Sequence, residues 1–108
     1  MLTFPKDFVW GSSTSGPQTE GRVPGDGKGD NLWDYWYKVE PNRYYNEIGP
    51  EQTSTFYEHW EQDIDLLAET GHTAFRTSIQ WSRVFPQGRG EVNPQGVAFY
   101  RQVFEAIK

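Results

Sequence analysis

Apolar side chains recur at helical spacing in two segments of the chain. Over residues 55–70 they form one stripe, made of Tyr57, Trp60, Ile64, Leu67 and Ala68. Over residues 94–107 a second stripe contains Val97, Tyr100, Phe104 and Ile107, with Val103 beside it. A spacing of three and four residues is typical of amphipathic helices, so both segments are predicted to be helical.

Signals for the ends of these helices strengthen the prediction. Thr55 and Glu58 have the spacing of a capping box, and Gly71 fits the residue just past the C-terminus. Asn93 is a favourable N-cap, and Pro94 suits the first helical position. We therefore expect one helix to end at about Thr70 and the other to begin at Pro94.

Two other segments favour strands. Residues 7–13 begin with Asp7, continue with Phe8, Val9 and Trp10, and end in small residues. Residues 73–81, "TAFRTSIQW", alternate with a period of two, which is typical of a strand. The alternation predicts an apolar face and a polar one. The apolar face has Phe75, Thr77, Ile79 and Trp81, and the polar face has Arg76, Ser78 and Gln80.

The segment between the first strand and the first helix has turn chemistry, as in "GRVPGDGKGDN", "EPNR" and "IGPEQ". A connection of this length is usually functional or disordered. The embedded "NLWDYWYKV" is too aromatic for disorder. We expect an ordered loop with a short structured piece.

The order strand, helix, strand, helix predicts an α/β fold with parallel strands and crossover helices. Two strands do not make a stable parallel sheet, because both faces must be covered. An α/β barrel needs about 250 residues. We therefore interpret residues 1–108 as the N-terminal portion of one catalytic TIM (β/α)8 barrel domain, about its first two βα units, truncated at the C-terminus.

The amino-acid composition limits the kinds of molecule that the protein is expected to bind. The net charge is −5 and the chain has no run of basic residues, which argues against nucleic acid and membrane surfaces as partners. There is no cysteine, and the two histidines lack metal-ligand spacing, so no metal and no cofactor are expected. These features fit a cytoplasmic protein. Aromatic residues make up 17% of the chain, which suits a core, a ligand site or both.

Three polar residues are candidates for a site, each with two readings from the sequence alone. Arg76 is either exposed on an open strand edge or holds a carboxylate from elsewhere. Gln18 is either a solvated loop residue or a ligand for vicinal sugar hydroxyls. Glu20 is either a general acid or base, or the salt-bridge partner of Arg22 or another loop cation; one carboxylate does not suffice for glycoside chemistry.

Three stretches, in this order, resemble glycoside hydrolase family 1. They are "FVWGSSTSGPQTEG", "DGKGDNLWDYW" and "YEHWEQDIDLLAETGHTAFRTSIQWSRVFPQGRGEVNPQGVAFY". The resemblance covers almost the whole chain and implies a TIM-barrel retaining β-glycosidase that takes a small sugar substrate. It implies that Gln18 binds sugar hydroxyls and that Arg76 contacts the carboxylate of the nucleophile. It also implies that both catalytic glutamates lie beyond Lys108, and it gives Trp33, Trp81, Ser82 and Arg83 mainly structural roles.

Two local variants resemble the bacterial 6-phospho-β-glucosidases, which cleave phosphorylated disaccharides. Thr77 follows the arginine, and Gly16 and Pro17 precede the glutamine. Plain β-glucosidase and 6-phospho-β-galactosidase remain alternatives within the family. From other classes, a small carbohydrate-binding module and an acidic interaction domain remain open. On the family reading, the rest of the barrel is needed for folding, and the 108-residue chain alone is inactive.

Overall fold

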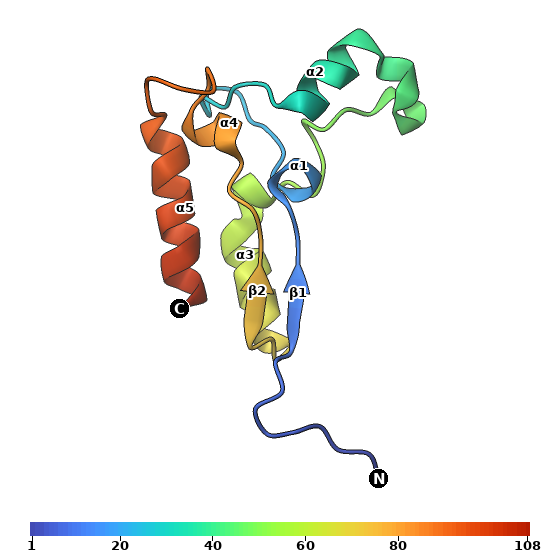
Figure 1. Cartoon of the computed structure of the whole chain (residues 1–108), viewed down its shortest axis with the longest axis vertical. Helices are drawn as coiled ribbons and strands as arrows, with labels where there is room; N and C mark the ends of the chain where they lie inside the picture. Colours follow the sequence, from blue (N-terminus) through green and yellow to red (C-terminus); the bar gives the residue numbers. More distant parts are fainter.

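A computed structural model describes all residues, 1–108. Its sheet has two parallel strands, with Gly11, Ser12 and Ser13 opposite Ala74, Phe75 and Arg76. Figure 1 shows both strands running toward the end of the molecule where the short helices gather, with α5 beside β2. In chain order the elements are β1 (Gly11–Ser13), α1 (Gly16–Thr19), α2 (Leu32–Val39), η1 (Pro41–Arg43), η2 (Tyr45–Glu47), α3 (Phe56–Glu69), β2 (Ala74–Arg76), α4 (Trp81–Val84) and α5 (Pro94–Ile107).

This order confirms the α/β prediction with parallel strands, but the strands are shorter than predicted. The first strand loses residues 7–10, and the second ends at Arg76, so that Trp81 begins α4 instead of lying in a strand. Each strand has only the other as a partner, and a strand extends only as far as its ladder of hydrogen bonds. Gly11 is required in this ladder, because a Cβ there would lie 2.9 Å from the Ala74 carbonyl oxygen.

The long helices form where their patterns predicted them. Asn93 accepts a hydrogen bond from the Gln95 amide at 3.2 Å, which confirms the cap of α5. At the end of α3, Gly71 has a φ of 77°, as the predicted C′ position requires. The capping box at the start of α3 was wrong: Thr55 has a left-handed backbone, and its hydroxyl donates to the Ser54 carbonyl.

The apolar core lies where α3, α5 and β2 meet, and consists of Phe56, Ile64, Phe99, Tyr100 and Val103. Phe75 of β2 packs toward α3, with its ring 6.4 Å from that of Phe56. On α5, Phe99 is buried and Phe104 is 40% exposed, although the stripe predicted Phe104 for the core. The packing places the covered face of the sheet against α3.

Candidate functional site

The segments that follow the two strands run together at one end of the sheet. In α/β barrels this carboxyl end of the strands carries the active site. Side chains join the two segments at three successive levels. The linked atoms are the hydroxyls of Thr14 and Thr77 at 3.1 Å, Gly16 N and Ser78 Oγ at 3.0 Å, and Glu20 Oε2 and Gln80 Nε2 at 3.2 Å.

Small residues between Trp10 and Gln18 allow this close approach. A Cβ at Gly16 would lie 2.9 Å from the Cβ of Gln80 and 3.1 Å from Oε1 of Glu20. No larger side chain fits without displacing one of these two groups. The small residues thus bring α1 against the segment after β2.

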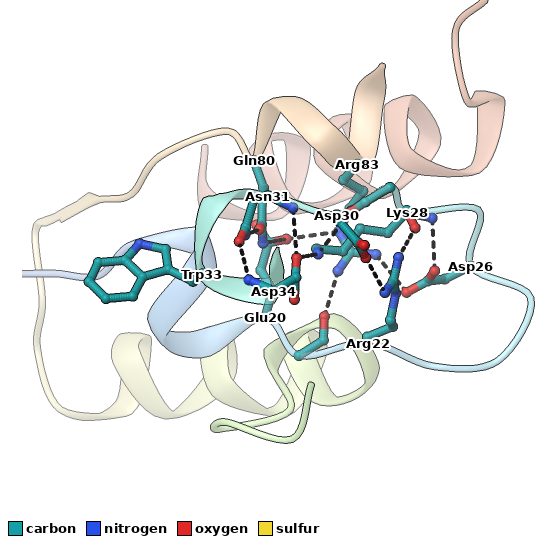
Figure 2. A network of polar contacts seen from close by, with 12 residues as sticks. Glu20, Arg22, Asp26, Lys28, Asp30, Asn31, Trp33, Asp34, Gln80 and Arg83 are labelled. Atoms are coloured by element: carbon teal, nitrogen blue, oxygen red, sulfur yellow. Dashed lines mark hydrogen bonds and ion pairs between the residues drawn. The ribbon is translucent and has the colours of Figure 1, made fainter. Parts of the chain in front are cut away.

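Glu20 lies at the centre of a buried polar cluster, most of which Figure 2 shows. Its Oε2 accepts hydrogen bonds from Gln80 and from Nε of Arg83, the latter at 2.8 Å. Its Oε1 accepts one from the hydroxyl of Tyr100 at 2.5 Å. The expectation that Glu20 forms a salt bridge is confirmed, but the expected partner, Arg22 or another loop cation, is wrong. Arg22 pairs with Asp30 at 3.0 Å, and the cation beside Glu20 is Arg83 of helix α4.

Arg83 is the most completely buried side chain of this cluster, with no exposed surface. It donates to Asp26 at 3.1 Å and to the Gly21 carbonyl oxygen at 2.8 Å, in addition to Glu20. Its guanidinium also lies 3.9 Å from the centre of the Tyr57 ring. These contacts provide hydrogen-bond acceptors for several N–H groups of the buried guanidinium, and a lysine does not have the same donor geometry. They confirm the interpretation of Arg83 as a structural residue.

The carboxyl group of Asp26 is held in its ionised form. Burial by itself acts to raise its pKa. Hydrogen bonds from the amides of Lys28 and Val23, together with the charge of Arg83, outweigh burial and hold the pKa of Asp26 below its usual value. Asp26 therefore faces Arg83 as a charged carboxylate.

A second buried ion pair connects α2 to the same cluster. Lys28 Nζ lies 2.5 Å from Oδ2 of Asp34, and both side chains are more than nine-tenths buried. Asn31 caps α2 by accepting from the Asp34 amide at 2.9 Å, and its side-chain amide donates to Gln80. The structured piece predicted within the loop is therefore a capped helix that is fixed to the strand ends.

Gln18, the predicted sugar ligand, lies on α1 with its side chain exposed. Its one hydrogen bond is from the hydroxyl of Ser15 at 2.7 Å. A hollow of about 340 Å³ lies beside it, with Trp33 and Tyr44 among its lining residues. Two aromatic rings next to an exposed carboxamide are the kind of surface on which a sugar ring binds.

Arg76 ends β2 at the same end of the sheet, and its side chain is exposed. Because side chains alternate along a strand, it faces away from the side on which Phe75 meets α3. No carboxylate of this chain lies within ion-pair distance of it. The guanidinium is therefore free to meet a group outside the 108 residues.

Sequence reasoning did not find the two buried ion pairs of Arg83, one with Glu20 and one with Asp26. Arg83 lies 63 residues from Glu20 along the chain. Asp26 lies in a turn-rich segment. Because Arg and Asp are rarely buried, neither residue was expected in a buried cluster. The sequence did carry one signal for Arg83: it follows Trp81 and Ser82, and this Trp-Ser-Arg sequence is part of the family motif.

No three His, Cys, Asp or Glu side chains are grouped to hold a metal ion. None of the helices combines the length and apolar character that a bilayer span requires.

Comparison with known proteins adds the family. The model of glycosyl hydrolase family 1 matches residues 1–108. The chain is 50% identical over 104 residues to "6-phospho-beta-glucosidase GmuD" of Bacillus subtilis (strain 168), covering 96% of this chain and 22% of the relative. It is 43% identical over 108 residues to "6-phospho-beta-galactosidase" of Streptococcus mutans serotype c, covering 94% and 21%.

Among solved structures, "Family 1 b-glucosidase from Thermotoga maritima" is similar, with a TM-score of 0.88 and 33% identity. The match covers 96% of this chain and 23% of that structure. The chain spans about a fifth of the length of the relatives that it matches. It is the N-terminal part of a barrel of this kind, which confirms the predicted fold class.

Proposed function

We propose, from the premise that this chain belongs to glycosyl hydrolase family 1, that the whole protein is a retaining glycoside hydrolase acting on 6-phospho-β-D-glucosides. One observation carries the choice of substrate: half of the aligned residues are identical to a protein named for that activity. The dipeptide before Gln18 and the threonine after Arg76, both at the strand ends, support the same choice.

In the proposed mechanism this chain supplies part of the glycone subsite and neither of the two catalytic carboxylates. Retaining enzymes place two carboxyl groups about 5–5.5 Å apart, and one of them attacks the anomeric carbon. The other protonates the leaving oxygen and then activates water. In this proposal both glutamates come from later strands of the barrel.

Gln18 and Arg76 have distinct roles in the proposal. The exposed carboxamide of Gln18 donates to and accepts from sugar hydroxyls, and these bonds strengthen as the ring distorts toward the transition state. The guanidinium of Arg76 lies beside the nucleophile and lowers the pKa of that carboxylate, which keeps it ionised. The exposure of both side chains and their common end of the sheet support these roles.

The rest of the barrel is also proposed as the partner on which folding depends. Leu66, Ile79 and Trp81 are each more than half exposed, and they are apolar. Exposed apolar surface of this extent is costly in water unless another part of the protein covers it. The proposed location is the cytoplasm, where phosphorylated sugars accumulate after uptake by a phosphotransferase system.

A comparison of chromogenic substrates tests the function. We expect the whole protein to hydrolyse p-nitrophenyl 6-phospho-β-glucoside with a kcat/KM well above that for the plain β-glucoside. A preference for the plain glucoside would favour β-glucosidase, and a preference for 6-phospho-β-galactoside would favour the activity for which the second relative is named. The purified 108-residue chain is the negative control, and turnover by it would contradict the proposed division of the site.

A further inference from the structure

The hydroxyl of Tyr100 is a bridge between the two segments that follow the strands. It donates to Oε1 of Glu20 at 2.5 Å, on the segment after β1. It accepts from the backbone amide of Gln80 at 2.7 Å, on the segment after β2. Tyr100 itself comes from a third element, α5, and its ring is buried against Phe99. One oxygen atom therefore joins two segments that lie about 60 residues apart in the chain, in addition to the three direct links between those segments.

The protonation of this hydroxyl suits the bridge. Burial and the neighbouring carboxylate of Glu20 raise the pKa of Tyr100 well above its usual value. The phenol stays neutral, so it can donate to the carboxylate and accept from the amide at the same time.

Gln18 lies on the turn that ends at this bridge. Glu20 follows two residues after Gln18, and its amide donates to the Gly16 carbonyl oxygen at 3.0 Å, which closes the turn that carries Gln18. The side chain of Gln18 has only the hydroxyl of Ser15 as a partner. Its placement therefore comes from the backbone of α1, which is anchored at its start by the bond from Gly16 N to Ser78 Oγ and at its end through Glu20.

We propose that Tyr100 is a positioning residue for substrate binding: its hydroxyl holds Glu20, and with it the turn that carries Gln18, at a fixed distance from the segment that follows β2. The inference rests on the proposed function of Gln18 as a sugar ligand. Tyr100 does not touch the substrate, and it acts only through Gln18.

A double-mutant cycle in the whole protein tests the proposal. Tyr100→Phe removes one oxygen and keeps the buried ring. We expect it to lower kcat/KM by about tenfold, mainly through KM, because misplacement of a ligand group weakens its bonds to the substrate. We expect Gln18→Ala to lower kcat/KM by about tenfold or more. In the Gln18→Ala background, Tyr100→Phe should then change kcat/KM by less than about twofold.

The matched control is Tyr45→Phe, since Tyr45 is 86% exposed and should give unchanged kinetics. An equal loss on Tyr100→Phe in both backgrounds would mean a general structural role and would overturn the proposal, as would no loss at all. Should Tyr100→Phe fail to fold, Glu20→Gln replaces it in the same cycle. We again expect the loss of kcat/KM to disappear in the Gln18→Ala background. An equal loss in both backgrounds would overturn the proposal.

The cycle also separates this inference from the proposed function. It is measured with whichever β-glycoside the protein hydrolyses best, so a preference for a non-phosphorylated substrate removes the proposed substrate and leaves the test intact. Unchanged kcat/KM in Gln18→Ala would remove Gln18 from the sugar site and overturn the positioning role of Tyr100, even if the phosphorylated substrate is correct.

Discussion

The charged cluster at the strand ends and the apolar body of the sheet differ in how many of their interaction partners lie within the 108 residues. In the cluster, Arg83, Glu20 and Asp26 have their partners within the 108 residues, as do Lys28 and Asp34. Only Ser82 Oγ, among buried side-chain polar atoms, lacks a partner.

The body of the sheet is far less complete. A hollow of about 130 Å³ lies among apolar residues of α3, β2 and the end of α5. Each strand has one free edge, and the face that carries Arg76 is open. The contrast follows from the energetics: an unpaired buried charge costs far more than an exposed apolar side chain, so charges are neutralised close by. Three substitutions test this contrast, each made in the whole protein.

The largest effect is expected from Arg83→Met, which keeps the bulk of the side chain and leaves Glu20 and Asp26 buried without their cation. We expect the free energy of unfolding to fall by about 3–5 kcal/mol, measured by urea denaturation. The control is Arg43→Met, whose pair with Glu40 is at the surface at 3.4 Å and should contribute less than about 1 kcal/mol. Equal effects at the two arginines would remove the distinction between the cluster and the surface.

Arg76→Met should act mainly on catalysis, since no carboxylate of residues 1–108 depends on this guanidinium and its proposed partner is the nucleophile. In the proposed site the charge of Arg76 stabilises the nucleophile, so its loss should lower kcat/KM by about 100-fold, or about 2.7 kcal/mol. Steady-state kinetics and a urea titration on the same samples separate the two effects. Arg101→Met, at an exposed position on α5, is the control. Wild-type kinetics for Arg76→Met would exclude Arg76 from the site.

Asp26→Asn should change how stability depends on pH. The pKa of Asp26 is lowered in the folded state from its usual 3.8, so its ionised form stabilises the fold above that pH. This contribution is lost as the pH falls below 3.8 toward the folded pKa. We expect the variant to lose about 1–3 kcal/mol at pH 7 and to show a shallower loss of stability below pH 4 than the wild type. Parallel pH profiles would show that Asp26 does not titrate as described.

The sequence by itself determined the two long helices, their order with the strands and the family motifs. Helical periodicity and the signals at Asn93, Pro94 and Gly71 act over a few residues, so they can be recognised without knowing the tertiary contacts of the helix. The order of the elements, the chain length and the order of the motifs also sufficed to identify an N-terminal part of a larger barrel.

Only the tertiary structure decided where the strands end, which side of α5 is buried and what Glu20 binds. Strand length depends on a partner's backbone, and the choice of Phe99 over Phe104 depends on where α3 lies. Glu20 and Arg83 are separated by 63 residues in sequence. No local pattern encodes that distance, because a buried ion pair forms only when the fold brings both charges out of water together.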